Sequence, residues 1–331
     1  MNRTIVVDDA PAPPGAGAFL QAPDARHLLG LEGLPGDALV DLLDSAARYR
    51  ERLRTPRWVS DELRGIAICN AFFEDSTRTR VSFELAEQRL GAIHTTFTTS
   101  GSSLSKGESM LDTLKVLTAM HVDLVVVRHR SAGSSTFLAR HLEAGVINAG
   151  DGEHEHPTQG LLDLLTLSDA WEGRFAGRRL AIIGDIAHSR VARSAIFGLT
   201  TLGAVVTIAG PATLVPAEAE SLGCAVVGTV EEALRNADGA MALRLQRERM
   251  EGGLIASTSE YARVWGITRE RVALMRPGAV VLHPGPMNRG VEIAPEVADG
   301  NESRVFRQVE NGLAVRCAVL ARCAQALTEE S

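Results

Sequence analysis

The chain has 331 residues, of which 45% are hydrophobic and 23% charged, and its formal net charge is -7. This acidic balance excludes an extended nucleic-acid surface, which needs a concentrated basic face. No apolar run approaches the roughly 20 residues that span a bilayer, so we expect a soluble globular protein without a membrane partner. The first 25 residues lack the pattern of a secretory signal, and the expected location is the cytoplasm.

The length suits two domains of roughly 150 residues each. Residues 1–25 are rich in Pro, Gly and Ala without hydrophobic periodicity, which predicts a Pro-rich arm or a disordered extension. We expect a first domain at 26–156 and a second at 157–303. The last segment, 304–331, predicts a C-terminal helix that returns to the first domain.

Helical and strand-like segments alternate along the body of the chain. Short continuous apolar runs, which suit strands buried on both faces of a parallel sheet, lie at 66–73, 123–129, 146–150, 180–185, 204–210, 239–244 and 279–285. Helical patterns lie at 81–90, 110–121, 160–168 and 304–327. This alternation predicts an α/β fold with two doubly wound domains and parallel central sheets.

The first candidate site is the turn that leads from the run at 66–73 into the next helix, where S-T-R-T-R extends from Ser76 to Arg80. Ser76 occupies the expected N-cap position. A helix N-terminus presents unpaired N–H groups and a positive dipole, to which this turn adds hydroxyls and guanidiniums. The combination suits a phosphate group, although a capped helix with exposed arginines has the same pattern.

The second candidate is a small, polar loop from Ser102 to Glu108 that carries Lys106. A lysine is a compact charge suited to phosphate oxygens, and a loop that contains glycine can bring it onto a ligand. An ordinary solvated turn is the alternative.

The third candidate, N-A-G-D-G-E-H-E-H-P-T-Q at 148–159, follows a predicted strand directly. Ligands of α/β folds bind at the carboxyl ends of strands, so His156 and Gln159 are well placed. His154 and His156 also raise the question of a metal, but they stand two residues apart in a loop and lack a third ligand pattern. We expect no metal ion, and the cysteines show no C-x-x-C spacing: Cys69, Cys224, Cys317 and Cys323.

Two arginines follow predicted strands in the second half of the chain. Arg190 lies in the turn after the run at 180–185, and Arg244 ends the run at 239–244. Two guanidiniums from successive turns would match a substrate with two carboxylates. The turn after the run at 180–185 is where a dinucleotide-binding domain would carry its glycine fingerprint, and Gly184 is the single glycine of this turn. We therefore expect no nicotinamide cofactor.

The fifth candidate is H-P-G-P, His283 to Pro286. Two prolines around a glycine fix a backbone whose carbonyls cannot all be paired locally, and such carbonyls can face a ligand. A plain rigid turn is the alternative.

Together these five segments resemble the aspartate/ornithine carbamoyltransferase family over nearly the whole body, from 26 to 327. They are similar to the aspartate branch, because Pro284 stands where the ornithine branch carries the cysteine of H-C-L-P. The resemblance implies transfer of the carbamoyl group from carbamoyl phosphate to L-aspartate, in de novo pyrimidine biosynthesis. Gly285 departs from the leucine of some relatives, and we expect function to survive because a backbone carbonyl is needed there.

The resemblance also implies roles for single residues. Carbamoyl phosphate would be bound by Ser76, Thr77, Arg78, Thr79, Ser102, Lys106, Arg128, His156 and Gln159. Aspartate would be bound by Lys106, Arg190, Arg244, Gln246, Pro284, Gly285 and Pro286, with a cis Gly285–Pro286 bond as in relatives. The catalytic set would be Arg78, Thr79, Lys106 and His156. The reaction needs positioning and charge stabilisation, without a covalent intermediate, a cofactor or a metal.

The family resemblance extends to assembly. It implies a homotrimer with shared active sites, since the loop that carries Ser102 and Lys106 reaches the neighbouring subunit in the family. Longer catalytic chains of the family associate with dihydroorotase chains or regulatory chains, and the arm at 1–25 is a candidate for docking such a partner.

Other functions stay open from the sequence alone. One is a carbamoyltransferase for another amino acid or amine, against which the two arginines and Pro284 argue. Another is a carbamoyltransferase-like subunit without activity. This alternative is disfavoured because every chemically essential position carries the residue that the reaction needs. A third is a dinucleotide-dependent oxidoreductase, which the missing glycine fingerprint disfavours.

Overall fold

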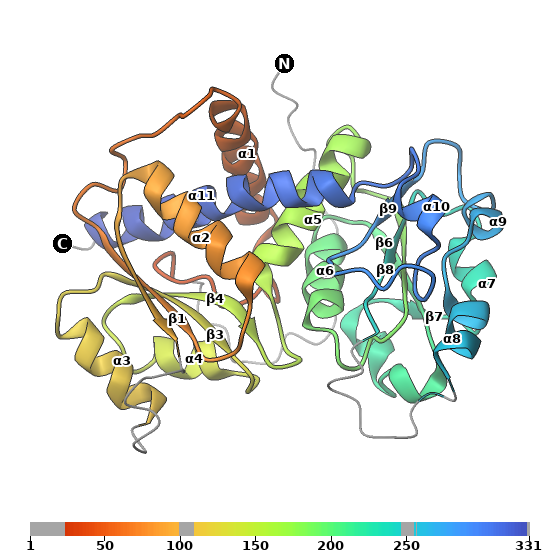
Figure 1. Cartoon of the computed structure of the whole chain (residues 1–331), viewed down its shortest axis with the longest axis horizontal. Coiled ribbons are helices and arrows are strands. Elements are labelled where there is room, and N and C mark those ends of the chain that lie inside the picture. The colour runs from red at the N-terminus through yellow and green to blue at the C-terminus, as the bar shows by residue number, and fades with distance from the viewer. Residues whose placement is uncertain (1–23, 99–108, 246–254, 256, 330–331) are drawn as a thin grey trace. The chain divides into compact units, whose positions relative to one another are not determined.

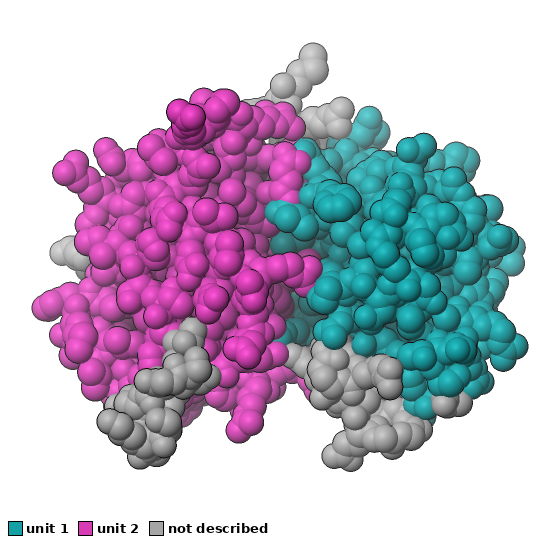
Figure 2. All heavy atoms as spheres, viewed as in Figure 1, with its two compact units in different colours: residues 1–17, 35–37, 162–309 teal, residues 18–34, 38–161, 310–331 magenta. Residues whose placement is uncertain are grey.

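We describe the chain from a computed structural model, in which residues 24–98, 109–245, 255 and 257–329 are described. They form two compact units, coloured separately in Figure 2. Unit 2 contains 24–34, 38–161 and 310–329, and unit 1 contains 35–37 and 162–309. None of the described helices is both long and apolar enough to span a membrane.

Unit 2 is built on a four-stranded parallel sheet of order β2-β1-β3-β4. Its strands are β1 (Ala67–Phe72), β2 (Ile93–Thr98), β3 (Leu124–His129) and β4 (Gly145–Asp151). Its helices are α1 (Gly36–Leu53) from residue 38, α2 (Thr77–Leu90), α3 (Met110–Thr118), α4 (Ser134–Ala139) and, from residue 310, α11 (Val305–Glu329). Figure 1 shows α2 and α11 on one side of this sheet and α3 and α4 on the other. The strands are therefore covered on both faces, which explains their continuous apolar runs.

The phosphate-motif helix, α2, begins and ends where its sequence predicts. Ser76 is its N-cap, and Gly91 is its C-cap in the left-handed conformation, with φ of 79°. Glycine is suited to that φ because it has no Cβ. Phe83, Ala86 and Leu90 are all fully buried, so the helical pattern predicted at 81–90 is confirmed.

Unit 1 holds a five-stranded parallel sheet of order β7-β6-β5-β8-β9. The strands are β5 (Arg179–Ile183), β6 (Val205–Ala209), β7 (Ala225–Val226), β8 (Gly239–Ala242) and β9 (Val280–Leu282). The helical elements are α6 (Arg190–Thr201), η2 (Ala212–Leu214), η3 (Ala219–Leu222), α7 (Val230–Leu234), α8 (Thr258–Trp265), α9 (Arg269–Val272) and α10 (Pro295–Ala298). The chain passes from unit 2 into this unit along α5 (Pro157–Ala170).

The predicted α/β class with two parallel sheets is confirmed, and all seven predicted strands are present. The sequence missed β2, an edge strand with polar and exposed positions, and β7, which has two exposed residues. The run at 279–285 yields a strand of three residues, because the backbone after Leu282 turns into the proline segment. The return of the C-terminal helix is also confirmed, since Asn311 accepts a hydrogen bond from Arg50 at 3.0 Å within unit 2.

Candidate active site

The groups expected to bind carbamoyl phosphate follow β1, β3 and β4 in unit 2. These strands are parallel neighbours, so their carboxyl ends meet at one edge of the sheet. The β1–β3 register places Phe72 opposite Arg128. The structure thus gathers the S-T-R-T turn, Arg128 and the loop at 152–156 at a single edge.

The S-T-R-T turn presents polar groups at the N-terminus of α2. Ser76 makes no hydrogen bond from its side chain to the helix, so its hydroxyl is not used as a cap. Thr77 and Arg78 are exposed, whereas Thr79 is buried. The helix has no acidic residue in its first turn, and its dipole therefore stays available to an anion.

Arg128 is buried and links the segments on either side of it. Its Nη1 donates to the carbonyl oxygen of Ala149 in β4 at 2.9 Å, and its Nη2 lies 3.7 Å from Oε1 of Glu74. Its own carbonyl accepts a hydrogen bond from the amide of Phe73 at 2.8 Å. The contacts of Nη1 and Nη2 orient the guanidinium, and the backbone contact joins β3 to the segment before the S-T-R-T turn.

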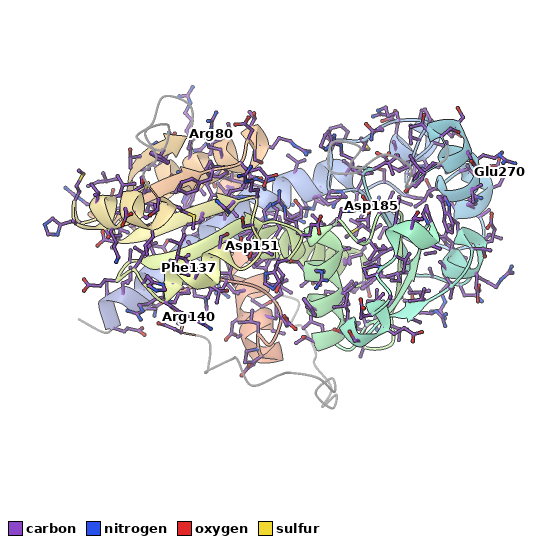
Figure 3. The ribbon with its side chains drawn as sticks, turned by 90° about the horizontal axis from the view of Figure 1, so that it is seen from below. Arg80, Phe137, Arg140, Asp151, Asp185 and Glu270 are labelled. Carbon is purple, nitrogen blue, oxygen red and sulfur yellow. The ribbon has the colours of Figure 1, made fainter. Side chains whose placement is uncertain are left out.

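His156 and Gln159 are placed by the start of α5, where Pro157 is the first helical residue. The carbonyl of His156 accepts hydrogen bonds from the amides of Gln159 and Gly160, at 2.9 and 3.1 Å. The His156 side chain is buried. Figure 3 labels Asp151 at the carboxyl end of β4, from which the loop leads to this histidine.

Asp151 and Asn148 hold this loop together. The Asn148 side-chain amide donates to Asp151 Oδ1 at 2.8 Å and to the carbonyl of Leu29 at 2.8 Å. Asp151 also accepts from the amide of Gly133 at 2.8 Å and from that of Glu155 at 3.1 Å. Both side chains are fully or almost fully buried. The loop that ends at His156 is therefore tied to three neighbouring segments of unit 2.

One group in unit 2 has the composition of a metal site, since Glu32, His154 and Glu155 offer ligand atoms within 4.8 Å of one another. Among these, Glu155 accepts hydrogen bonds from backbone amides. His154 Nδ1 lies 3.2 Å from Asp151 Oδ2, and this hydrogen bond raises the pKa of the histidine. The Glu155 carboxylate and the His154 imidazole thus have hydrogen-bond partners in the protein, and we assign no metal to this group.

In unit 1, Arg190 is the first residue of α6 and is buried. Its turn is held by Ser189, whose hydroxyl accepts from the amide of Ala192 at 3.1 Å. Asp185, labelled in Figure 3 after β5, is fully buried and lies 2.8 Å from Nδ1 of His188. Gly184 adopts a φ of 128°, so glycine is needed where β5 leads into this turn.

Arg244 and the proline segment follow the next two strands, β8 and β9. Arg244 is half-buried, and the amide of Leu243 before it donates to the carbonyl of Ile183 in β5 at 2.8 Å. Because β5, β8 and β9 are parallel neighbours, the two arginines and the segment 284–286 share one edge of the unit 1 sheet. The Gly285–Pro286 bond is cis.

The proline segment is oriented by His283, a fully buried side chain. Its Nε2 lies 3.0 Å from Glu292 Oε1, and its Nδ1 accepts from the amide of Gly285 at 2.8 Å. The amide of His283 donates to Gln308 Oε1 at 2.9 Å. The backbone carbonyls that follow are thus presented by a histidine held from three directions.

Three expected site residues, Ser102, Lys106 and Gln246, lie outside the described residues. The supporting carboxylates Glu74, Asp185 and Glu292 were not among the residues that the sequence singled out. Each stands in or beside a recognised motif. Asp185 and Glu292 are buried, and acidic side chains are rarely buried unless paired, but their partners are visible only in the fold.

Comparisons with known proteins agree with this arrangement. Residues 26–169 match the family model described as "Aspartate/ornithine carbamoyltransferase, carbamoyl-P binding domain". Residues 176–323 match the model described as "Aspartate/ornithine carbamoyltransferase, Asp/Orn binding domain". The two models together cover most of the chain.

Similar curated proteins carry the name aspartate carbamoyltransferase catalytic subunit. The protein from Gluconacetobacter diazotrophicus is 53% identical over 296 residues, which are 89% of this chain and 92% of the relative. The one from Pelotomaculum thermopropionicum is 52% identical over 295 residues, which are 89% of this chain and 95% of the relative.

Solved structures show the same fold. Aspartate transcarbamoylase from Trypanosoma cruzi in complex with carbamoyl phosphate has a TM-score of 0.80 at 27% identity, over 90% of this chain and 96% of that one. Ornithine carbamoyltransferase from Thermus thermophilus has a TM-score of 0.78 at 28% identity, over 90% of this chain and 98% of that one. Fold and motifs together define a two-domain α/β transferase. The chain belongs to the aspartate/ornithine carbamoyltransferase family.

Proposed function

We propose that the protein is an aspartate carbamoyltransferase, which forms N-carbamoyl-L-aspartate and phosphate from carbamoyl phosphate and L-aspartate in de novo pyrimidine biosynthesis. The observation that carries the choice of substrate is the pair Arg190 and Arg244, which follow neighbouring parallel strands of unit 1. Two guanidiniums suit the two carboxylates of aspartate. Relatives about half identical to the chain bear the name of this activity.

We propose that unit 2 binds carbamoyl phosphate. The phosphate would be bound by the α2 N-terminus with Ser76, Thr77, Arg78 and Thr79, and by Arg128, Ser102 and Lys106. His156 and Gln159 would bind the carbamoyl carbonyl oxygen and amide. The buried Arg128, fixed by Ala149 and Glu74, supports this assignment because a preoriented guanidinium loses little freedom on binding an anion.

We propose that unit 1 binds L-aspartate. Arg190, Arg244 and Gln246 would hold its carboxylates, with Lys106 contributing a charge. The carbonyls of Pro284 and Gly285, in the segment that ends with Pro286, would accept hydrogen bonds from its amino group. The His283 contacts support this role, because they fix the backbone that carries those carbonyls.

The chemistry is a direct acyl transfer. The neutral amino nitrogen of aspartate attacks the carbamoyl carbon, the C–N bond forms, and the C–O bond to phosphate breaks. The leaving phosphate takes up the proton released by the amine. Arg78, Thr79 and His156 would stabilise the negative charge that develops on the carbonyl oxygen, and Lys106 with Arg128 would neutralise the phosphate.

These roles define the proposed domains. Residues 26–156 would form the carbamoyl-phosphate-binding domain and residues 157–303 the aspartate-binding domain, with 304–331 as the returning helix. The segment at 1–25 would be an extension that docks a dihydroorotase or regulatory chain. The reaction would take place in the cytoplasm.

We propose that the chain acts as a homotrimer with shared active sites. Among the apolar side chains of unit 2 that are at least 40% exposed, five lie on or next to α2, β2 and α3: Val81, Leu85, Ile93, Val116 and Met120. Burial between copies of the chain would remove this apolar surface from water. These elements flank the segment that contains Ser102 and Lys106 in the sequence, which would reach the neighbouring site.

The test is an assay of the purified chain with carbamoyl phosphate and either L-aspartate or L-ornithine. Carbamoyl-aspartate should form, and citrulline should not. Activity with ornithine alone would overturn the choice of substrate, and activity with neither would favour a subunit without catalysis. A panel of other amino acids and amines in the same assay tests the remaining carbamoyltransferase alternative.

A further inference from the structure

A buried carboxylate stands directly before His156. Glu155 is fully buried, and the amide of Leu31 donates to both of its oxygens, at 3.0 Å to Oε1 and 2.8 Å to Oε2. The amide of Glu32 donates to Oε1 at 3.0 Å. A carboxylate withdrawn from water needs such donors, and backbone amides of a fixed segment hold it in one place.

The segment that supplies these amides belongs to unit 2 and is anchored to β4. Leu28 pairs with Ile147 in a parallel bridge, and its amide donates to the carbonyl of Val146 at 3.0 Å. Asn148 donates from its side chain to the carbonyl of Leu29 at 2.8 Å. The amides that bind Glu155 are therefore fixed to the sheet that carries the site.

Gly30 shows how closely this segment approaches the carboxylate. A Cβ added at Gly30 would lie 2.2 Å from Glu155 Oε1 and 3.0 Å from its carboxyl carbon. The backbone φ of Gly30 does not lie in the left-handed region, so the close approach is what requires glycine here. The two residues are 125 positions apart and fit against each other.

The backbone of Glu155 is also fixed. Its amide donates to Asp151 Oδ1 at 3.1 Å, and its carbonyl accepts from the amide of Asp151 at 3.1 Å. Hydrogen bonds thus hold both the side chain and the main chain of Glu155. The next residue is His156, whose carbonyl begins the hydrogen bonding of α5.

We propose that Glu155 is a positioning residue for His156. The contact with segment 30–32 fixes the peptide that enters α5 and thereby sets where the imidazole meets the carbamoyl oxygen. This inference rests on the proposed function for the role of His156 in turnover, but the position of the imidazole is a property of the protein itself. Small displacements of a positioned group have large effects on rate, on the order of a hundredfold for about 1 Å.

The contact can be changed from either side. Glu155→Gln keeps the size of the side chain but places an amide group, which has hydrogen-bond donors of its own, against two backbone N–H groups. Gly30→Ala keeps the Glu155 side chain itself unchanged, but the added methyl group would displace its carboxylate. Matched controls are Glu153→Gln, an exposed residue of the same loop, and Gly228→Ala, where an added Cβ meets no atom within 4 Å.

The experiment measures turnover and the imidazole together. In each contact variant we expect kcat to fall about tenfold or more, with KM for aspartate changed less than about twofold. The double variant should be little worse than the poorer single variant, because both changes remove one contact. The ring signal of His156, recorded by NMR on protein with labelled histidine and assigned with His156→Gln, should move in both variants and in neither control.

Normal kcat together with an unmoved His156 signal, in either contact variant that folds, would overturn the proposal. Melting temperatures identify the folded variants, and each variant alone is sufficient for this decision. An inactive wild-type protein would contradict the proposed function instead, and the NMR signal would still decide whether Glu155 positions His156.

Discussion

Asn70 in β1 donates a hydrogen bond from Nδ2 to Glu87 Oε2 in α2 across 2.8 Å, and neither side chain is exposed to solvent. Burial raises the pKa of Glu87 to about 8, from an ordinary value of 4.5. The folded protein therefore holds this proton more tightly than the unfolded chain does. The pair links the first strand of unit 2 to the helix that carries the S-T-R-T turn.

The pH dependence of stability follows from that shift. The contribution of neutral Glu87 is fully present below about pH 4.5 and is lost as the pH rises toward 8, at up to about 1.4 kcal/mol per pH unit. Urea unfolding of wild type and Glu87→Gln between pH 5 and 9 should show this slope only in the wild type. Glu143→Gln, at an exposed position, serves as the control. Parallel curves for all three proteins would contradict the prediction.

Removing the Arg78 side chain should be the most damaging single change to turnover. On the proposed binding mode, the developing oxyanion and the leaving phosphate would both lose a charged donor in Arg78→Ala. Loss of one such donor typically costs about 3 to 4 kcal/mol, so kcat should fall roughly a hundredfold to a thousandfold. Steady-state assays at saturating substrates measure this, with Arg140→Ala as an exposed control. Near-normal turnover of Arg78→Ala would remove Arg78 from the site.

Replacing either of the two arginines of unit 1 should weaken the binding of aspartate and leave the binding of carbamoyl phosphate unchanged. On the proposed binding mode, Arg190→Gln and Arg244→Gln would each remove a hydrogen bond to a carboxylate of aspartate, which is worth about 1.5 to 3 kcal/mol. KM for aspartate should therefore rise by roughly one to two orders of magnitude. Calorimetry should find the Kd for carbamoyl phosphate within about twofold of the wild-type value. Equal losses for both ligands would mean that these arginines act on the fold and have no specific role for aspartate.

Shared active sites predict recovery of activity by mixing. Lys106→Ala and Arg78→Ala should each be nearly inactive when assembled alone. If Lys106 serves the neighbouring site, trimers assembled from both variants contain some sites with every group intact. Unfolding and refolding the two proteins together should then restore measurable turnover, and separate refolding should not. A mixture that stays inactive while forming mixed trimers would contradict shared sites.

Local sequence patterns were sufficient to predict most of the strands and helices of the fold. Buried strands such as β3 and β4 are apolar on both faces, and Gly91 suits the left-handed end of α2 because it has no Cβ, whereas the Ser76 hydroxyl makes no capping hydrogen bond at the other end. The edge strand β2 escaped prediction because polar and exposed positions such as Thr95 and Thr96 do not produce an apolar run. Such a strand is recognised only from its hydrogen-bonded pairing with a neighbouring strand, here β1.

Contacts between distant segments could not be read from the sequence. The motifs marked His156 and Arg128, but not the residues that orient them, such as Glu155 against Gly30 or Glu74 beside Arg128. The sequence does not distinguish a buried Glu or Asp from an exposed one. Only the fold shows which of them lies against backbone amides.

This chain should join the aspartate nitrogen to the carbamoyl carbon. Carbamoyl phosphate labelled with ¹³C and aspartate labelled with ¹⁵N, incubated with the purified protein, test it directly by NMR. We expect a carbamoyl-aspartate carbon signal split by its bond to ¹⁵N, together with one phosphate released for each product. A carbon signal without that splitting, or a coupled product only when labelled ornithine replaces aspartate, would contradict it.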